Sequence, residues 1–245
     1  PGHAENGRAR SMTETTLDVT RIRAITFDFD DTLWPIAPVI QRAEQVLRDW
    51  FAEHAPAVLE RYDEAAVHAL RQRVGDANPE LLHDMTALRL KTIRVMLDSV
   101  GADTQRADDA FAAFYTARNA VVCFDDVAEG LGRLAKRFRL AGLTNGNGRP
   151  GPDTGLHVLE HTVYAREVGC AKPDPRIFAH TADHLELQPD AILHVGDHPH
   201  ADVAGARASG FQAVWLSRLD STWPTTDRPP VTVRCLRELA DRLGA

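Results

Sequence analysis

The sequence has few cysteines and no long apolar stretch. Its three cysteines, Cys123, Cys170 and Cys235, lie far apart in the chain and are odd in number. A disulfide framework is therefore excluded, and we expect a reducing, cytoplasmic setting. No run of about 18 apolar residues occurs, so we expect no membrane span. The N-terminus also lacks the basic segment followed by an apolar one that a secretory signal needs.

Basic residues are outnumbered by acidic ones. The chain has 28 Lys and Arg against 35 Asp and Glu, which gives a net charge of -7. General nucleic-acid binding needs a basic face, so we expect no nucleic-acid partner. A small anionic ligand remains compatible with this charge, because the local field of a site can oppose the net charge. The oligomeric state is not encoded in any pattern of this kind.

The length of the chain limits its domain organisation. At about 150 residues per domain, 245 residues fit one large domain or one domain with a sizeable insertion. Residues 1–11 (PGHAENGRARS) are typical of a tag or a disordered arm, with Met12 as a native start. We therefore set residues 1–20 apart from the fold.

Strand-like and helix-like segments alternate over much of the chain. The patterns predict strands over 23–29, 139–144, 162–166, 191–195 and 211–216, and helices over 127–135, 175–187, 201–209 and 235–243. Residues 218–230 form a polar, proline-rich loop in this interpretation. Such alternation predicts an α/β fold, a Rossmann-like parallel sheet with right-handed crossovers.

One long segment interrupts this alternation. No strand pattern occurs between residues 38 and 123, and apolar positions recur at helical spacing. The periodic positions are Val39, Ala43, Val46, Leu47 and Trp50, then Leu81, Met85, Leu88, Thr92 and Val95, then Ala107, Phe111, Phe114 and Arg118. We expect an all-helical inserted domain over 38–125 and a core domain over 21–37 and 126–245. Residues 35–38 and 123–126 are the natural linkers.

Polar motifs follow the predicted strands. They are Asp28-Phe29-Asp30-Asp31-Thr32, Thr144-Asn145-Gly146-Asn147, Ala171-Lys172-Pro173, and Gly196-Asp197 with Asp202 five positions later. Ligands of open parallel sheets bind at the carboxyl ends of the strands. The motifs are therefore expected to meet at one site.

These residue types suit phosphoryl transfer. The Asp28 carboxylate can attack phosphorus and form an aspartyl-phosphate. Because two anions repel, this attack needs a cation, and Asp28 and Asp197 can bind Mg²⁺ together with a substrate phosphate. Asp30, two residues further on, is placed to protonate the leaving oxygen and then to activate water.

The remaining motif residues would stabilise the transferring group. Thr144 and Asn145 can donate hydrogen bonds to the phosphoryl oxygens, and Lys172 can neutralise charge. Three roles stay open for Asp202: contacting the metal, holding Lys172, or capping the next helix.

The pattern DxDxT, then Thr-Asn, then Lys-Pro, then GDxxxxD resembles the haloacid dehalogenase superfamily of phosphatases, over residues 23–217. The resemblance implies that superfamily's fold, with the helical insertion as a cap of its first type that closes over the site. It further implies Mg²⁺ as cofactor, a small phosphorylated metabolite as substrate, and a metal site formed by Asp28, Asp30, Asp197 and Asp202.

A closer resemblance concerns the substrate. The runs AITFDFDDTLWPIAPVI, NPELLHDMTALRLKTIRVMLDSVG, LTNGNGRP and ILHVGDHPHADVAGARASG are similar to the flavin mononucleotide phosphatase branch. That branch also dephosphorylates the ribitylaminouracil phosphate of riboflavin synthesis. The likeness extends into the insertion and includes His83, Asp84, Thr86 and Arg89, of which His83 and Arg89 are candidate substrate contacts. Trp34 is a further candidate, at the mouth of the site.

Some features depart from the pattern or suggest other functions. His198 replaces the acid that often follows Gly-Asp, and residues 149–155 are rich in proline and glycine. Residues 146–151 match GxGxxG, but the prolines that follow interrupt the helix that a dinucleotide site needs. The pairs His157/His161, His180/His184 and His194/His198 lack a third zinc ligand nearby. Other phosphatase substrates (phosphoglycolate, sugar phosphates, nucleotides), a phosphomutase, a dehalogenase and a phospho-receiver module remain alternatives.

Overall fold

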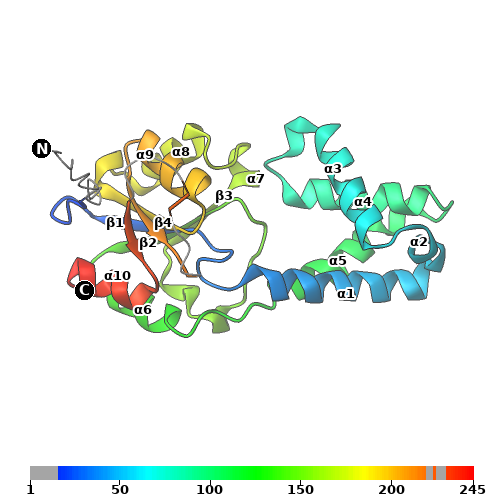
Figure 1. Cartoon of the computed structure of the whole chain (residues 1–245), viewed down its shortest axis with the longest axis horizontal. Coiled ribbons are helices and arrows are strands. Elements are labelled where there is room, and N and C mark those ends of the chain that lie inside the picture. The colour runs from blue at the N-terminus through cyan, green and yellow to red at the C-terminus, as the bar shows by residue number, and fades with distance from the viewer. Residues whose placement is uncertain (1–15, 219–222, 225–229) are drawn as a thin grey trace, which may run out of the picture.

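A computed structural model of the protein describes residues 16–218, 223–224 and 230–245. These residues form a parallel sheet covered by helices and, beside it, a group of helices joined to the sheet by two chain segments (Figure 1). The predicted α/β Rossmann-like fold class is confirmed. Most of the predicted N-terminal arm and of the loop over 218–230 lies outside the described residues. Leu17 and Val19, which we had assigned to the arm, pack against the core of the sheet.

The sheet has six parallel strands in the order β3-β2-β1-β4-β5-β6. They are β1 (Ala24–Phe27), β2 (Arg139–Thr144), β3 (His161–Tyr164), β4 (Ile192–Gly196), β5 (Gln212–Leu216) and β6 (Val231–Val233). The chain extends the sheet first to one side of β1 and then to the other, so the strand order reverses between β1 and β4. Ligands bind at such a switch point. The edge strand β6 was not predicted, because three residues are too few for an alternating pattern to be visible.

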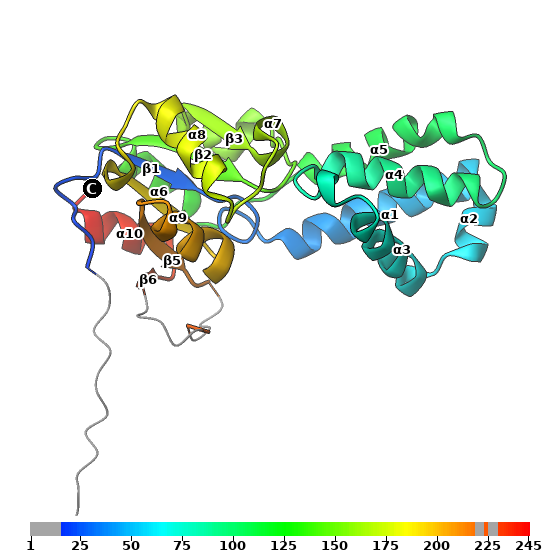
Figure 2. The same ribbon diagram turned by 90° about the horizontal axis from the view of Figure 1, so that it is seen from above.

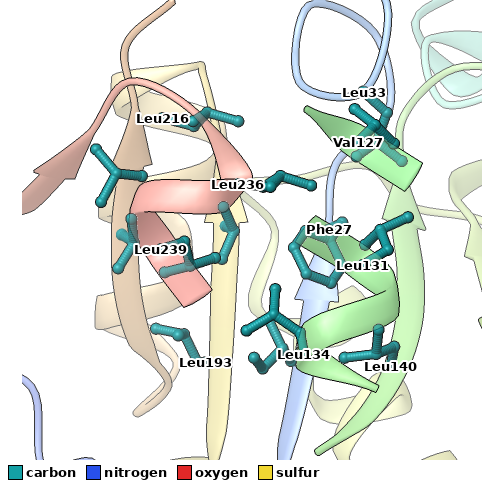
Figure 3. Close-up of a cluster of buried hydrophobic side chains, with 14 of the residues drawn as sticks. Phe27, Leu33, Val127, Leu131, Leu134, Leu140, Leu193, Leu216, Leu236 and Leu239 are labelled. Carbon is teal, nitrogen blue, oxygen red and sulfur yellow. The ribbon is translucent and has the colours of Figure 1, made fainter. Parts of the chain in front are cut away.

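Helices cover both faces of the sheet. α6 (Val127–Leu134) and α10 (Leu236–Leu243) pack on one face, where Leu131, Leu134 and Leu239 meet the strand residues Phe27 and Leu193 (Figure 3). α8 (Pro175–Leu185) and α9 (Gly205–Ala208) pack on the other face. With both faces covered, the central strands β1 and β4 are buried at every position and their neighbours β2 and β5 at all but the first, which explains their largely apolar sequences.

Several short elements refine the predicted pattern. The strand expected over 162–166 ends at Tyr164, because the helical turn α7 (Ala165–Val168) begins there. The helix expected over 201–209 begins earlier, as a π-helical segment (Pro199–Ala204) that continues into α9. Short 3₁₀ segments cover Pro152–Thr154, Leu156–Val158 and Pro189–Ala191. The π-helical segment follows the Gly-Asp motif closely, and in it the Asp202 carboxylate lies next to Gly196 at the end of β4 and accepts a hydrogen bond from the His198 N–H.

The second group of helices, which we call the cap, comprises α1 (Ile36–His54), α2 (Pro56–Arg61), α3 (Glu64–Asp76), α4 (Met85–Asp98) and α5 (Ala107–Asn119), with 3₁₀ turns at Pro79–Leu81 and Thr104–Arg106. It has its own apolar core, which includes Phe51, Ile93 and Phe114. Seen from above, the cap lies beside one end of the sheet (Figure 2). α1 begins before the boundary expected at residue 38. None of the described helices is long and apolar enough to cross a membrane.

Candidate active site

The loop after β1 is a tight turn that connects the sheet directly to the cap. The Leu33 N–H donates to the Phe29 carbonyl at 2.7 Å, and the Asp31 N–H donates to the Trp34 carbonyl at 2.8 Å. Asp31 adopts a left-handed backbone with φ of 59°. Its carboxylate accepts a hydrogen bond from the Ile36 N–H at 2.9 Å, at the start of α1. The position of the neighbouring acids is thereby fixed by backbone contacts.

Lys172 lies at the centre of the acidic residues. Its ammonium donates to Asp28 Oδ1 at 2.7 Å, to Asp202 Oδ1 at 2.6 Å and to the Leu143 carbonyl at 2.7 Å. An ammonium has three donors, so this set satisfies all of them. Burial alone would lower the pKa of Lys172, but the two carboxylates beside it raise that pKa. The lysine therefore remains a cation next to the expected nucleophile.

The Asn145 side chain has a different position from the one expected. Its Nδ2 donates to the Lys172 carbonyl at 2.9 Å, and its Oδ1 accepts from the Lys172 N–H at 2.8 Å. Both ends of the amide are therefore engaged by the backbone, so the side chain fixes the Lys172 loop rather than reaching toward a substrate. Thr144, by contrast, lines the cavity above Asp28, and its Oγ1 accepts a hydrogen bond from the Gly146 N–H at 3.0 Å.

Three carboxylates form a group that suits a hard cation. Asp28, Asp197 and Asp202 each offer an oxygen, and these oxygens all lie within 4.8 Å of one another. Burial, Asp202 and Asp31 raise the pKa of Asp197 to about 7. Burial also raises the pKa of Asp28, against the opposing effect of Lys172. Mg²⁺ prefers oxygen ligands of this type, and its charge would relieve the repulsion, so the donor set fits it.

Asp202 uses both of its oxygens within the protein. Oδ1 accepts from Lys172 and lies 3.1 Å from His194 Nε2, while Oδ2 accepts from the His198 N–H at 2.9 Å. Gly196 permits this arrangement, since a Cβ there would lie 2.3 Å from the Asp202 carboxyl carbon. Of the three roles left open for Asp202, holding Lys172 is the one that its contacts match.

His194 extends this network into the sheet. Its Nδ1 lies 2.8 Å from Thr26 Oγ1, and its ring packs edge-on against Phe178. Burial lowers the pKa of His194, so the imidazole is neutral. The sequence analysis considered His194 only as part of the pair His194/His198. Its position inside a predicted buried strand could have indicated that its ring has a polar partner there. Within the described ranges, the carboxylate group above is the only cluster suited to a metal.

Asp30 faces the cap instead of the carboxylate group. Arg118 Nη2, from α5, donates to both Asp30 oxygens at 2.7 Å, and Trp34 Nε1 donates to Oδ1 at 2.8 Å. Burial raises the pKa of Asp30, and Arg118 opposes that change. Trp34 does not line the mouth of the site as we expected. Its side chain is fully buried and packs against Phe29, because an indole of this size fills the core beneath the loop.

Two adjoining cavities lie at the carboxyl ends of the strands. One, of about 210 Å³, is lined by Asp28, Thr144, Lys172 and Asp197, among others. The other, of about 260 Å³, lies under the cap. Asp30 and Gly146 line both cavities, so the acid expected to serve the leaving group stands between them.

Comparison with known proteins identifies the family. The sequence model of the haloacid dehalogenase-like hydrolases matches residues 22–210. The chain belongs to this family. The 5-amino-6-(5-phospho-D-ribitylamino)uracil phosphatase YigB of Escherichia coli (strain K12) is 34% identical over 227 residues, which cover 89% of this chain and 95% of that protein. The phosphoserine phosphatase of Thermus thermophilus is 31% identical over 215 residues, or 83% of each chain.

A solved structure gives the same family. The 2-haloacid dehalogenase from Pseudomonas syringae pv. Tomato DC3000 superposes with a TM-score of 0.83 at 35% identity, and the match covers 91% of this chain and 98% of that one. The expected family is confirmed. The expected enzyme class, a phosphoric monoester hydrolase of this family, is confirmed by its phosphatase relatives.

The structure places the cap residues that the closer resemblance pointed to in three different settings. Arg89 lines the cavity under the cap, where its guanidinium lies 4.1 Å above the Phe114 ring and bonds to Glu44 at 2.5 Å. Thr86 accepts from Asn147 Nδ2 at 3.1 Å, so it links cap and core. His83 lines neither cavity, which argues against substrate contact.

The two departures from the family pattern differ in position. His198 lines the cavity of the carboxylates, and its Nδ1 accepts from the Ala201 N–H at 3.0 Å. The proline-rich segment lies elsewhere. Arg149 stacks on Tyr164 at 4.4 Å, and residues 149–152 line a separate cavity of about 480 Å³ beside β3.

Arg118 is a candidate site residue that sequence reasoning missed. It was noted only as a position in the helical spacing of residues 107–118. An arginine on an otherwise apolar helix face was the available signal. Its side chain is 2% exposed, and it bonds directly to Asp30.

Proposed function

We propose that this hydrolase is a Mg²⁺-dependent phosphatase that cleaves a small phosphorylated metabolite through an aspartyl-phosphate on Asp28. One observation carries the proposal: two carboxylates, Asp28 and Asp30, follow the central strand and line one cavity, with the Lys172 ammonium 2.7 Å from the first. A carboxylate beside a cation suits nucleophilic attack on phosphorus. A second acid, at the boundary with the cap cavity, suits protonation of a leaving oxygen.

The residues divide the reaction into two displacements. In the first, an Asp28 oxygen bonds to phosphorus while the ester P–O bond breaks, and Asp30 gives its proton to the departing oxygen. In the second, Asp30 takes a proton from water as that water attacks the aspartyl-phosphate, which releases inorganic phosphate and restores Asp28. Lys172 neutralises charge on the phosphoryl group, and the Thr144 hydroxyl donates to it.

Asp28 and Asp197 would bind Mg²⁺. When bound, the ion supplies the positive charge that lets a carboxylate approach a phosphate dianion. Asp202 is less suited to direct contact, because its oxygens already accept hydrogen bonds from Lys172 and the His198 N–H. Asp30, the fourth expected ligand, directs its carboxylate toward Arg118.

The substrate that we favour is the ribitylaminouracil phosphate of riboflavin synthesis or flavin mononucleotide. Support comes from the Escherichia coli relative, which is a phosphatase of the former compound and 95% of whose length is matched. Phosphoglycolate, sugar phosphates, nucleotides and a phosphomutase reaction are the alternatives within the family. The cysteines, all free, support a reducing, cytoplasmic setting.

Dehalogenation is a second candidate, favoured by the name of the Pseudomonas syringae protein. A halide leaves without a proton, so a dehalogenase has no use for an acid at the position of Asp30. An alkoxide leaving group needs that proton. The position of Asp30 between the two cavities therefore favours the phosphatase.

The test is product release from a substrate panel with Mg²⁺: ribitylaminouracil phosphate, flavin mononucleotide, phosphoglycolate, sugar phosphates, nucleotides and 2-chloropropionate. We expect phosphate from a riboflavin-pathway compound and none with Asp28→Asn. Chloride release from 2-chloropropionate would favour the dehalogenase. A phosphoryl group that stays on the protein for hours would instead indicate a receiver module, and transfer to a second substrate position a mutase.

A further inference from the structure

Arg118 is a charged residue enclosed at the contact between the cap and the sheet. Its side chain is 2% exposed, and its Nη2 donates to both oxygens of Asp30 at 2.7 Å. In the part of the chain that the structure describes, its buried Nη1 has no hydrogen-bond partner. A buried charge with an unpaired donor costs stability, so its presence calls for an explanation. Because almost none of the guanidinium is accessible to a substrate, an effect of Arg118 on the reaction must act through Asp30.

Asp30 is held by donors from two parts of the chain. Trp34 Nε1, from the loop after β1, donates to Oδ1 at 2.8 Å. The Trp34 side chain is fully buried, so this donor is fixed within the core. The Arg118 guanidinium comes from α5, the last helix of the cap, after which the chain returns to the core (Figure 1). The direction of the Asp30 carboxylate therefore depends on where the cap places Arg118.

The end of α5 is attached to the loop that follows β2. The Tyr115 hydroxyl donates to the Asn147 carbonyl at 2.9 Å, and Asn119 Oδ1 accepts from the Arg149 N–H at 2.7 Å. Residues three and four positions apart share one face of a helix, so Tyr115, Arg118 and Asn119 all face the core. These contacts fix the part of α5 from which the Arg118 side chain extends.

The same loop has glycines where the ion pair lies against it. A Cβ at Gly148 would lie 2.7 Å from Arg118 Nη1, and one at Gly146 would lie 2.7 Å from Asp30 Oδ2. A side chain at either position would displace one member of the pair. The loop thus leaves room for a guanidinium bound to Asp30, a residue that lines both cavities.

A purely structural ion pair is the alternative explanation. The pair of Arg218 and Asp126 is of that kind: it joins core segments at 2.8 Å, and neither residue lines the two cavities of the site. Asp30 differs, because its side chain is 25% exposed and lines both cavities. Arg118 thus holds a carboxylate that a substrate can reach.

We propose that Arg118 is a positioning residue for the reaction: from the end of α5 it sets the orientation of the Asp30 carboxylate at the boundary between the two cavities. This assignment rests on the proposed phosphatase function, in which Asp30 serves as acid and then as base. Arg118 itself contacts neither the substrate nor the reacting atoms. Its loss should therefore lower kcat with little change in KM, since misplacement of a reacting group by about 1 Å can cost about a hundredfold in rate.

The decisive experiment is a double-mutant cycle between Arg118 and Asp30. It uses the alkyl phosphate that the parent enzyme turns over fastest in the substrate panel. Arg118→Met should lower kcat about a hundredfold and change KM less than about threefold. In the Asp30→Asn background, the same substitution should lower kcat less than about threefold further, because no carboxylate remains to be positioned. Arg94→Met, at an exposed arginine of α4, is the control and should change neither value.

p-Nitrophenyl phosphate separates positioning from general damage to the site. Its phenolate leaves without a proton, so Arg118→Met should keep a burst of nitrophenolate with a rate within about threefold of the parent, while the later turnover slows. Arg118→Lys keeps a cation beside Asp30, and its kcat on the alkyl phosphate should be about tenfold above that of Arg118→Met.

Tyr115→Phe tests the same assignment without removing a buried charge, and it takes the place of Arg118→Met if that variant fails to fold. Loss of the hydroxyl frees the end of α5 from the Asn147 carbonyl, so kcat should fall about three- to tenfold. In the Asp30→Asn background this effect should disappear. Tyr62→Phe loses a hydroxyl contact to Ser99 inside the cap, so it is the matched control and should keep the parent values.

The outcomes separate the two proposals. Equal losses of kcat with and without the Asp30 carboxylate, a slowed burst, or a loss that appears mainly in KM would overturn the positioning assignment while phosphatase activity stands. Absence of phosphate release by the parent enzyme from every compound, p-nitrophenyl phosphate included, would instead overturn the proposed function.

Discussion

Arg118 Nη2 lies 2.7 Å from each carboxylate oxygen of Asp30, so a single ion pair joins the last cap helix to the loop after the central strand. The Arg118 side chain is 2% exposed and that of Asp30 is 25% exposed. A charged pair in such a setting is screened little by solvent. The position of the cap is therefore coupled directly to the acid that we assign to the leaving group.

The glycine that faces this ion pair should be sensitive to substitution. In Gly148→Ala the new Cβ would lie 2.7 Å from Arg118 Nη1 and 3.0 Å from Cζ, so the guanidinium must shift relative to Asp30. Misplacement of about 1 Å can cost about a hundredfold in rate, and we expect kcat/KM to fall at least tenfold. Gly151→Ala is the control, since a Cβ there has no neighbour within 4 Å. Equal activities of the two variants would contradict the prediction.

Asp30→Asn should separate the two displacements. With an alkyl phosphate, turnover should fall by about 10²–10⁴, because no acid protonates the leaving oxygen. With p-nitrophenyl phosphate, whose phenolate leaves without a proton, stopped-flow absorbance should still record a burst of about one equivalent before slow turnover. Asp108→Asn, an exposed acid of α5, should behave as the parent does. A missing burst would mean that Asp30 acts otherwise.

The core and its motifs could be predicted because each is local in sequence. Buried strands appear as short β-branched runs, and their ends mark where ligands bind, so Asp28, Lys172 and Asp197 could be assigned to one place without coordinates. They indeed line one cavity. β6 could not be predicted, because an edge strand of three residues has too few positions for periodicity.

The contacts of the site depend on distances that no local pattern encodes. Asn145 occurs in the expected motif, yet its amide bonds to the Lys172 backbone, 27 positions away. Arg118 bonds to Asp30 across 88 positions, a pairing that depends on how α5 returns to the core. Trp34 was assigned to the mouth because of its place in the sequence, whereas packing against Phe29 buries it. The position of a residue in a motif therefore predicts where in the fold it lies, but not which group its side chain contacts.

Asp197 and Asp202 should differ in their effect on metal affinity. Asp197→Asn removes a ligand, and we expect the half-saturating Mg²⁺ concentration to rise more than about tenfold. Asp202→Asn removes a charged partner of Lys172, so it should lower kcat. The half-saturating Mg²⁺ concentration should change less than about threefold. Phosphate release titrated with Mg²⁺ measures both quantities. A larger shift in half-saturation for Asp202→Asn would assign it to the metal instead.

Asp126 should be important for stability, because it joins three segments of the core. It is 1% exposed, its Oδ1 accepts from Arg218 at 2.8 Å, and its Oδ2 accepts from the Leu236 N–H at 2.6 Å. Asp126→Asn leaves Arg218 without its charged partner. We expect the free energy of unfolding, measured by urea denaturation, to fall by about 2–4 kcal/mol. The neighbouring Asp125 is an exposed control, and Asp125→Asn should cost less than about 1 kcal/mol. Similar losses for the two variants would contradict the role assigned to burial.

The carboxylate group should make the metal-free protein less stable at higher pH. Burial, Asp202 and Asp31 raise the pKa of Asp197 from 3.8 to about 7 in the folded state. A carboxyl with a raised folded pKa contributes stability that is fully present below its unfolded pKa and is lost as the pH rises through the folded value. We therefore expect this carboxyl to lower the melting temperature in EDTA between about pH 4 and pH 7, and Mg²⁺ to raise the melting temperature more at pH 8 than at pH 5, since binding needs ionised ligands. Asp197→Asn should reduce both the fall in melting temperature with pH and the rise caused by Mg²⁺. If Mg²⁺ raised the melting temperature equally at every pH, the Asp197 carboxylate would be excluded as the group responsible.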